Sequence, residues 1–199
     1  MKRRIFLFTV SFIFLISSFS FAQEAKVFFS PQGGCTGAIV SALSKARQTL
    51  DIAMYSFTSD DIAQEIVQAK RKGTKIRMIC DKTQAGQRAS QIEFLKTQGI
   101  PVRIYQGAGI MHNKFAVIDG KVLMTGSFNW TTNAEDENAE NLLILTDQKL
   151  IAKYEKEFGH LWVQGEEEPG HQSFSKIKQN LMKYLMQLLK EFSKILFKK

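Results

Sequence analysis

Several kinds of functional site have few or none of their residues in this 199-residue sequence. Cys35 and Cys80 are the only cysteines, and no histidine lies near either, so they cannot complete a four-ligand zinc site. Glu135, Asp136 and Glu137 are consecutive rather than spaced for shared coordination, and we expect a solvated loop there instead of a metal site. No array of aromatic residues suited to stacking bases is evident, so the sequence indicates no base preference.

Internal repetition and net charge are also lacking in the globular part of the chain. Only one His-x-Lys pair occurs, because His160 is followed by Leu-Trp and His171 by Gln-Ser. The net charge of +8 lies at the two ends: residues 1–22 carry +3 and residues 171–199 carry +6, which leaves −1 for residues 23–170. A basic protein is the usual footprint of nucleic-acid binding. Here any attraction for phosphate must come from individual lysines or from the C-terminal segment.

The first 22 residues have the pattern of a signal peptide. Lys2, Arg3 and Arg4 form a positive start, the stretch from Ile5 to Phe21 is apolar or hydroxylated, and Ser20-Phe21-Ala22 places small residues where a signal peptidase reads them. An uncleaved membrane anchor is the alternative, since the stretch is only marginally short of the about 20 residues that span a bilayer. Both readings predict export, to the periplasm or outside the cell.

The two cysteines allow two structural interpretations in an exported protein. Cys35 and Cys80 are an even pair and could form one disulfide. Alternatively, Cys80 ends the apolar run IRMIC and is simply a small buried hydrophobic residue.

Strand and helix signals alternate through residues 23–165, which we expect to form one domain. Expected strands are Lys26–Phe29, Asp51–Phe57, Lys75–Cys80, Pro101–Tyr105 and Glu140–Leu145, and expected helices are Cys35–Thr49, Ser59 to about Gly73, Gln87–Gln98 and Asp147–Val163. The β-rich runs 111–118 and 121–125 flank Asp119-Gly120, a strong hairpin signal. The pattern predicts an α/β fold, with a mixed, mostly parallel β-sheet flanked by helices.

A charged linker, residues 166–170, separates this domain from a basic amphipathic tail, residues 171–199. Apolar residues recur in the tail at spacings of three and four, and lysines fill much of the remainder: Phe174, Ile177, Leu181, Leu185, Leu188, Phe192 and Ile195 are the apolar positions. Such a helix could lie on an anionic membrane, pack on a partner or cover the domain's own surface.

The segment from His112 to Asn129 carries the clearest chemical pattern, H-x-K-x4-D-x6-G-S-x-N. Glu140 follows in the run AENLLIL. The pattern puts an imidazole, an ammonium, a hydroxyl and a carboxamide within a short double-strand segment. Cleavage of a phosphodiester needs such groups, namely a nucleophile or proton carrier and several donors for the non-bridging oxygens.

This pattern resembles the HKD motif of the phospholipase D superfamily, and the similarity extends through YSFT at residues 55–58 and the ENLLIL run. The branch that it resembles most has a single motif: the bacterial Nuc-type endonucleases and the mitochondrial Zucchini-like nucleases. The resemblance covers roughly residues 26–164. Many members with two motifs have one more residue between the serine and the asparagine, so the shorter GSFN fits the single-motif nucleases better.

The resemblance implies a catalytic role for several residues. His112 would attack phosphorus and carry it as a phosphohistidine. Lys114 would neutralise the phosphate oxygens as a point charge, and Asn129 would donate to the same oxygens. Ser127 would orient groups by hydrogen bonding, with the serine hydroxyl as nucleophile the alternative. Glu140 would orient the histidine ring, unless it is an ordinary surface residue at a strand edge.

Two motif residues are expected to have structural roles. Asp119 sits at the hairpin turn, where aspartate is favoured for bonding to nearby backbone, and Gly126 belongs to the motif's Gly-Ser pair. No metal or cofactor is expected, because Lys114 and a protonated histidine already supply positive charge.

A single motif supplies one histidine, whereas the mechanism needs a nucleophile and a protonated general acid. The resemblance implies that two copies form a homodimer with one composite site. The expected function is a metal-independent phosphodiesterase, with a nonspecific endonuclease favoured. A phospholipase D-type lipid hydrolase at the membrane surface is the alternative, and a non-catalytic nucleic-acid or membrane-binding module is a second. DNA, RNA and phospholipid all remain open as substrates.

Overall fold

The computed structural model describes residues 24–166, 182–187 and 189–190. The expected signal peptide, all but the first residue of the expected linker and most of the expected tail lie outside these residues. Residues 182–187 and 189–190 are helical, and Met182, Tyr184 and Leu185 expose their side chains. No helix among the described residues is both long and apolar enough to cross a bilayer.

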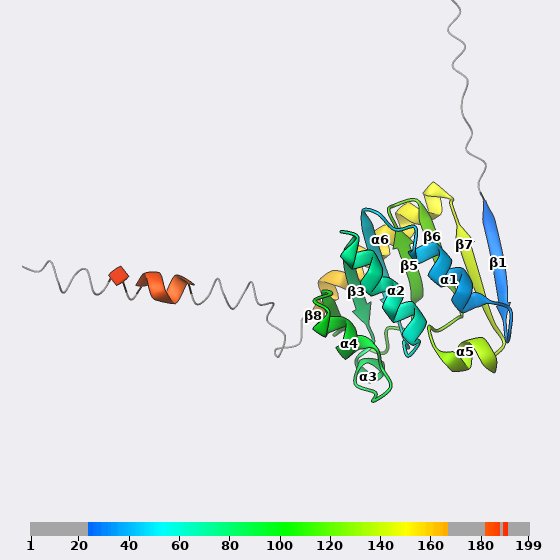
Figure 1. Ribbon diagram of the computed structural model, residues 1–199, viewed down its shortest axis with the longest axis horizontal. Helices are drawn as coiled ribbons and strands as arrows, with labels where there is room; N and C mark the ends of the chain where they lie inside the picture. The colour runs from blue at the N-terminus through cyan, green and yellow to red at the C-terminus, as the bar shows by residue number, and fades with distance from the viewer. Residues whose placement is uncertain (1–23, 167–181, 188, 191–199) are drawn as a thin grey trace, which may run out of the picture.

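Eight strands of the described chain form one sheet in the order β1-β7-β6-β5-β2-β3-β4-β8 (Figure 1). They are β1 (Ala25–Ser30), β2 (Thr49–Met54), β3 (Lys75–Cys80), β4 (Val102–Tyr105), β5 (Lys114–Ile118), β6 (Val122–Gly126), β7 (Glu140–Leu145) and β8 (Gly165–Glu166). Strands β2, β3 and β4 pair in parallel, and all the other neighbours pair antiparallel. The sheet is mixed, as expected, but fewer pairs are parallel than expected, because β5, β6, β7 and β1 add to the side of β2 as antiparallel neighbours.

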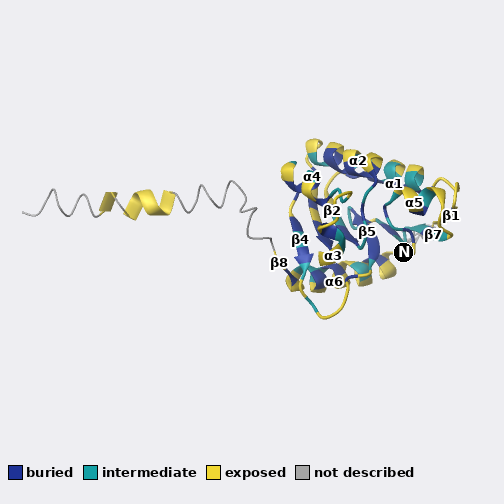
Figure 2. Ribbon diagram, turned by 90° about the horizontal axis from the view of Figure 1, so that it is seen from below, coloured by how far each residue is buried: buried dark blue, intermediate teal, exposed yellow. Residues whose placement is uncertain are grey.

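Helices cover both faces of the sheet (Figure 2). Helices α1 (Cys35–Leu43), α2 (Asp60–Arg71) and α4 (Ile92–Thr97) lie on one face, and α6 (Gln148–Gln164) lies on the other. The alternation along β5 feeds two cores, since Ala116 and Ile118 pack toward α1 and α2 while Phe115 and Val117 pack toward α6. The α/β architecture with helices on both faces is therefore confirmed.

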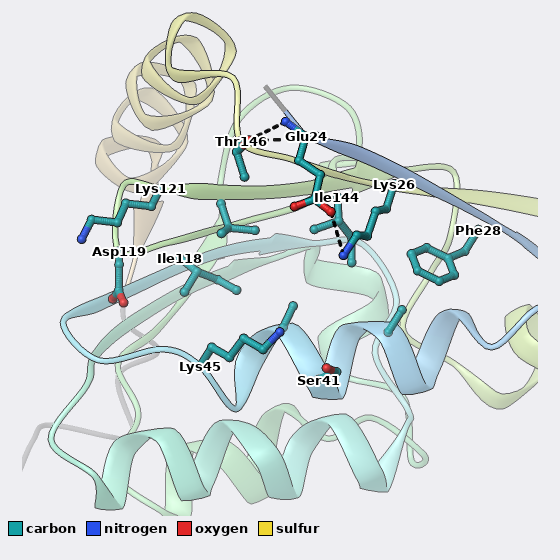
Figure 3. A pocket seen from close by; sticks show the side chains of 13 residues that line it. Glu24, Lys26, Phe28, Ser41, Lys45, Ile118, Asp119, Lys121, Ile144 and Thr146 are labelled. Carbon is teal, nitrogen blue, oxygen red and sulfur yellow. Dashed lines mark hydrogen bonds and ion pairs between the residues drawn. The ribbon is translucent and has the colours of Figure 1, made fainter. Parts of the chain in front are cut away.

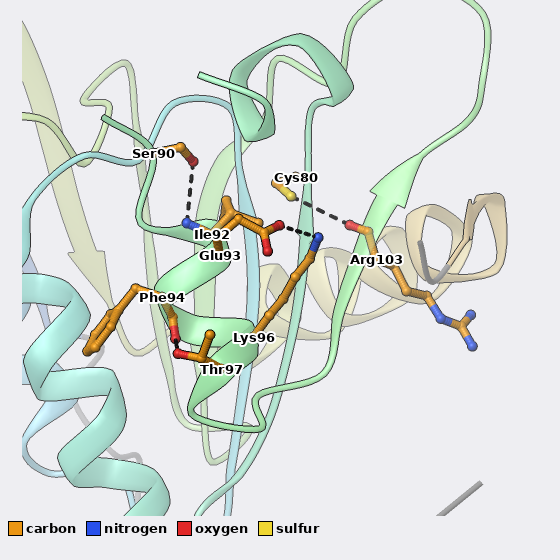
Figure 4. A network of polar contacts seen from close by, with 8 residues as sticks. All are labelled: Cys80, Ser90, Ile92, Glu93, Phe94, Lys96, Thr97 and Arg103. Atoms are coloured by element: carbon orange, nitrogen blue, oxygen red, sulfur yellow. Dashed lines mark hydrogen bonds and ion pairs between the residues drawn. The ribbon is translucent and has the colours of Figure 1, made fainter. Parts of the chain in front are cut away.

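Two helices are shorter than their sequence patterns predict. Helix α1 ends at Leu43 instead of near Thr49, because residues 47–49 turn into β2 with their backbone N–H groups bound by the Asp119 carboxylate. In the expected helix 87–98, α4 begins only at Ile92, where the Ser90 hydroxyl accepts a hydrogen bond from the Ile92 N–H (3.3 Å; Figure 4). The short helices α3 (Lys82–Ala85) and α5 (Thr132–Asp136) were not expected.

Cys35 and Cys80 are both buried thiols, and no disulfide joins them. The Cys80 thiol donates to the carbonyl oxygen of Arg103 at 3.6 Å (Figure 4). Burial, helped by the charge of Glu135, raises the pKa of Cys35 to about 11. Of the two interpretations that the sequence left open, the buried hydrophobic residue is the one that the structure shows.

Candidate active site

Five strands bring their ends to one edge of the sheet. The carboxyl ends of the parallel strands β2 and β3 meet there, and the antiparallel partners contribute the start of β5, the end of β6 and the start of β7. The short helices α3 and α5 lie at this same end of the molecule (Figure 1). Polar groups that follow parallel strands collect at such an edge, which is where open α/β sheets bind ligands. We call this end of the strands the motif edge, as distinct from the edge strands β1 and β8.

His112 lies two residues before the start of β5, with an exposed side chain. Its ring lies 4.5 Å from the ring of Tyr55, centroid to centroid, at an interplanar angle of 58°. The preceding residue, Met111, is buried in the core under α6, and its N–H donates to the Asp81 carboxylate at 3.0 Å. The imidazole is therefore presented to solvent from a backbone that is fixed on its N-terminal side.

Lys114 is the first residue of β5 and lies opposite Met54 of β2. It is only 8 % exposed, its Nζ donates to the His112 carbonyl oxygen at 2.8 Å, and it lies 5.0 Å from the centre of the Tyr55 ring. Desolvation lowers the pKa of Lys114, and the charge of Glu140 partly opposes this shift. A cation bonded to the His112 backbone in such surroundings interacts with a phosphate more strongly than one in water.

Ser127 fastens the end of β6 to the start of β7. Its hydroxyl accepts a hydrogen bond from the Asn141 N–H (3.0 Å), and its own N–H donates to the Asn141 side-chain oxygen (2.9 Å). The hydroxyl hydrogen remains available to another acceptor, so the group can still act on a bound phosphate. The two bonds fix the position of Ser127 between β6 and β7, while its side chain stays exposed at the site.

Asn129 is half-buried and faces the end of β2. Its side-chain oxygen accepts from the Ser56 N–H at 3.3 Å, and the next residue, Trp130, is held by backbone bonds to Ser56, Thr58 and Ser59. This contact fixes which end of the carboxamide points inward. The Nδ2 group has no partner within the residues that the structure describes, so it can donate to an incoming oxygen.

Glu140 begins β7 and is half-buried. Its carboxylate accepts from the Asn138 amide at 3.3 Å, and its charge acts on Lys114. No hydrogen bond joins Glu140 to the His112 ring within the described part of the chain. Orientation of the ring by this carboxylate therefore stays a prediction.

Asp119 lies at the far end of β5 from His112, in the turn that leads to β6. It has a φ of 53°, and its carboxylate accepts hydrogen bonds from the backbone N–H groups of Arg47, Gln48 and Thr49 at 2.7–3.2 Å. Gly126, at the motif edge, packs so closely that an added Cβ would lie 2.1 Å from the Asn141 carbonyl oxygen. Neither residue presents a functional group to His112.

Three further residues organise the site and were not picked out as site residues from the sequence. Asp81 is 2 % exposed and binds the N–H groups of Thr83 and Met111, which joins α3 to the segment before His112. Gln84 of α3 donates to the Tyr55 hydroxyl at 3.2 Å, and Tyr55 contacts both His112 and Lys114. Tyr55 and Asp81 directly follow the parallel strands β2 and β3, and that position is the sequence signal that could have identified them.

The acidic run near α5 differs from the expected solvated loop. The Glu135 carboxylate accepts hydrogen bonds from the N–H groups of Gly34 (3.0 Å) and Thr36 (2.6 Å), at the start of α1. Its negative charge thus caps a helix N-terminus. Among the described residues, no group of three or more histidine, cysteine or acidic side chains could hold a metal ion.

Comparisons with known proteins identify the family and the fold. The family model described as "Cardiolipin synthase, PLD-like domain" matches residues 39–162. The mitochondrial cardiolipin hydrolase of Chlamydomonas reinhardtii is 43 % identical over 120 residues, which are 60 % of this chain and 54 % of that protein. In general the chain spans about half to two thirds of the length of the curated relatives it matches.

Two solved structures are similar over nearly their whole length. The phospholipase D family member Nuc from Salmonella typhimurium has a TM-score of 0.69 and 31 % identity, over 72 % of this chain and 97 % of that one. NucT from Helicobacter pylori has a TM-score of 0.67 and 30 % identity, over 72 % and 98 %.

Proposed function

Because the chain belongs to the phospholipase D superfamily, we propose that it is a metal-independent phosphodiesterase, and specifically a nonspecific endonuclease. One observation carries the proposal. At the motif edge the side chain of His112 is exposed, and the desolvated Lys114 ammonium donates to the carbonyl oxygen of His112. The inward-held carboxamide of Asn129 belongs to the same edge. Together they supply a nucleophile and two donors for the oxygens of one phosphodiester.

The reaction follows from these groups. One ring nitrogen of His112 attacks phosphorus, an N–P bond forms, and the bond from phosphorus to the leaving oxygen breaks. The leaving oxygen takes a proton from a second, protonated histidine. Water then attacks phosphorus, the N–P bond breaks, and the proton of the water returns to the second histidine. Lys114 and the Asn129 amide stabilise the charge on the non-bridging oxygens in both steps.

The second histidine is proposed to come from another copy of the chain. Besides His112, the described residues include His160, which is exposed on α6 beside Glu157 (3.7 Å). Helix α6 covers the opposite face of the sheet from α1 and α2, and among the described residues no hydrogen bond, ion pair or ring contact joins His160 to His112 or Lys114. A two-fold axis near two copies of His112 would place two imidazoles around one phosphate.

Nucleic acid is the favoured substrate because exposed cations flank the motif edge. Lys82 begins α3, the helix that contacts Tyr55 through Gln84, and Arg88 follows it in the next loop. Neither residue forms a salt bridge within the described chain. A polyanion could contact them with phosphates on either side of the one being cleaved, as charged groups do along a nucleic-acid backbone.

A phospholipid is the second candidate, supported by the similarity to cardiolipin hydrolases and by the basic apolar pattern of residues 171–199. In this alternative, the tail would hold the enzyme on an anionic membrane. With the pattern of residues 1–22, either substrate fits an exported protein, periplasmic or secreted.

The test is hydrolysis by the full chain in EDTA, with single-stranded DNA, duplex DNA, RNA and cardiolipin vesicles as separate substrates. We expect cleavage of nucleic acid in the chelator, loss of activity in His112→Ala, and full activity in the control His160→Ala. Acid-labile, alkali-stable phosphate on the wild-type protein would identify the phosphohistidine. Activity that disappears in EDTA and returns with Mg²⁺ would refute the metal-free mechanism, and cleavage of lipid alone would transfer the proposal to the second substrate.

The dimer is tested separately by sedimentation of the active protein. We expect activity to follow the dimer on dilution. Mixing His112→Ala with Lys114→Ala should give no rescue, because each half of a composite site then carries one damaged residue. A fully active monomer would contradict the composite site.

A further inference from the structure

A cavity of about 360 Å³ opens at the edge of the sheet opposite the motif edge (Figure 3). It lies between the C-terminal half of α1 and the ends of β5 and β7, beside the start of β1. Asp119 and Thr146, which mark this edge, both line it. The cavity is therefore separate from His112 and Lys114, at the other end of β5.

The wall of the cavity is apolar because α1 does not fully cover the strands beneath it. Phe28, Val122 and Ile144 project from the sheet on the side of α1, and each is only partly buried in the core. Helix α1 presents the small residues Ala38 and Ala42 to them. A hollow with hydrophobic walls results where larger side chains would have closed the core. Its volume falls at the small end of the range for ligand pockets, about 300–1,000 Å³.

The rim of the cavity is basic. Lys26, Lys45 and Lys121 line it together with two carboxylates, Glu24 and Asp119. Glu24 pairs with Lys26 at 2.9 Å, and the Asp119 carboxylate is occupied by three backbone N–H groups. Neither Lys45 nor Lys121 forms a salt bridge in the described part of the chain, although the charge of Lys121 acts on the nearby Asp119 carboxylate. Figure 3 shows Lys45, just after α1, beneath the cavity, and Lys121, just before β6, beside Asp119 at one end of it.

We propose that this cavity binds a long-chain fatty acid, with the alkyl chain between α1 and the sheet and the carboxylate between Lys45 and Lys121. Apolar walls with a cationic rim complement a molecule that is apolar along its length and carries one negative charge at its end. The small volume suits one alkyl chain rather than two. This inference is independent of the proposed hydrolysis, because no residue of the motif edge takes part.

Binding is measured by isothermal titration of the full chain with laurate below its micellar concentration. We expect one saturable site, and a melting temperature that rises with ligand because only the folded protein has the cavity. Lys45→Glu combined with Lys121→Glu should weaken binding at least tenfold. Lys153→Glu combined with Lys156→Glu, on α6, is the matched control and should bind as wild type does. Dodecanol, which has the same chain length without the charge, should bind at least tenfold more weakly than laurate.

A second variant tests the apolar wall. Ala42→Trp should fill the cavity and abolish binding, whereas Ala152→Trp, at an exposed position of α6, should not. The charge-reversal variant changes only exposed side chains, so it keeps the test valid even where Ala42→Trp fails to fold. Absence of saturable binding would overturn the proposal. The proposal would also be overturned if the charge-reversal variant and Ala42→Trp both bound laurate with wild-type affinity. The ligand would then bind the apolar stretches of residues 1–23 or 171–199 and not the cavity.

Discussion

Replacement of Asp119 separates the structural part of the motif from its chemistry. The carboxylate accepts hydrogen bonds from three consecutive backbone N–H groups, those of Arg47, Gln48 and Thr49, and so joins the α1–β2 connection to the β5–β6 turn. Five residues of β5, roughly 17 Å of strand at about 3.3 Å per residue, separate this turn from the motif edge. Asp119→Ala should therefore lower stability while leaving the activity of each folded molecule unchanged.

The magnitude follows from the contacts that are lost. A hydrogen bond to a charged group contributes about 1.5–3 kcal/mol. The three donors are exposed and can bind water instead, which reduces the loss to about 2 kcal/mol in total. Alanine at a φ of 53° adds about 1 kcal/mol. We expect Asp119→Ala to reduce the free energy of unfolding by about 3 kcal/mol, and Asp119→Asn by about half of that. Asparagine tolerates this backbone conformation and keeps one acceptor oxygen.

The difference between wild type and Asp119→Ala should depend on pH. Partial burial raises the pKa of Asp119, but the hydrogen bonds from Thr49, Gln48 and Arg47 lower it more, so the pKa in the folded protein lies below its ordinary value of 3.8. The stabilisation is therefore complete above that ordinary value and disappears as the pH falls through the folded-state pKa.

Urea unfolding at pH 7 and at points between pH 5 and 2.5 measures this difference, and hydrolysis per folded molecule measures the activity. A stability difference that does not shrink at low pH would refute the carboxylate argument. If fully folded Asp119→Ala protein were less active than wild type, the claim that Asp119 has no part in catalysis would be refuted.

Three other changes give direct checks on the site and the core. Gly126→Ala should destabilise the protein by about 3 kcal/mol in urea, because its Cβ would meet the Asn141 carbonyl oxygen at 2.1 Å; a loss below 1 kcal/mol would contradict that close approach. Lys114→Met should lower the rate of hydrolysis by about 100- to 1,000-fold. Its melting temperature should be no lower than that of wild type, because burial lowers the pKa of Lys114 and so makes its charge costly to the fold. A melting temperature several degrees lower would show instead that the cation stabilises the strand ends at the motif edge. Cys35 in the native protein should resist alkylation at pH 8, because its pKa of about 11 keeps the thiol protonated, and rapid labelling measured by mass spectrometry would contradict its burial.

The regular part of the fold could be predicted because it rests on short-range patterns. Short apolar and β-rich runs identified the strands, and Asp119-Gly120 identified the β5–β6 hairpin, in which the two residues have positive φ values of 53° and 62°. Ser59 caps α2, as a local rule predicts for its residue type. Asp119 has a structural role, as expected, but it binds backbone groups of residues 47–49 and not the nearby backbone that the local rule predicts. The superfamily also followed from the sequence, because the motif's spacing is itself a local property.

The remaining features depend on contacts between distant segments. The Asp119 carboxylate reaches residues about 70 positions earlier, Asp81 binds Met111, and Glu135 caps α1 across 101 residues. No local pattern encodes which backbone groups a carboxylate will meet. The parallel content of the sheet was overestimated for the same reason, since β1 finds its partner in β7 and not in β2. Orientation of His112 by Glu140 stays a prediction from resemblance.

The pairing of β1 with β7 has a consequence for the order in which the chain can fold during synthesis. Glu24 bonds to Thr146 across 122 residues, so β1 cannot pair until its partner β7, which is synthesised much later, has been made. Until residues 140–145 have emerged, β1 has no partner strand, and its apolar residues Val27 and Phe29, which stay exposed even in the folded sheet, are accessible to other chains. Holdase protection should therefore matter most for this strand, and ribosome-bound chains that stop short of residue 140 should remain protease-sensitive at β1.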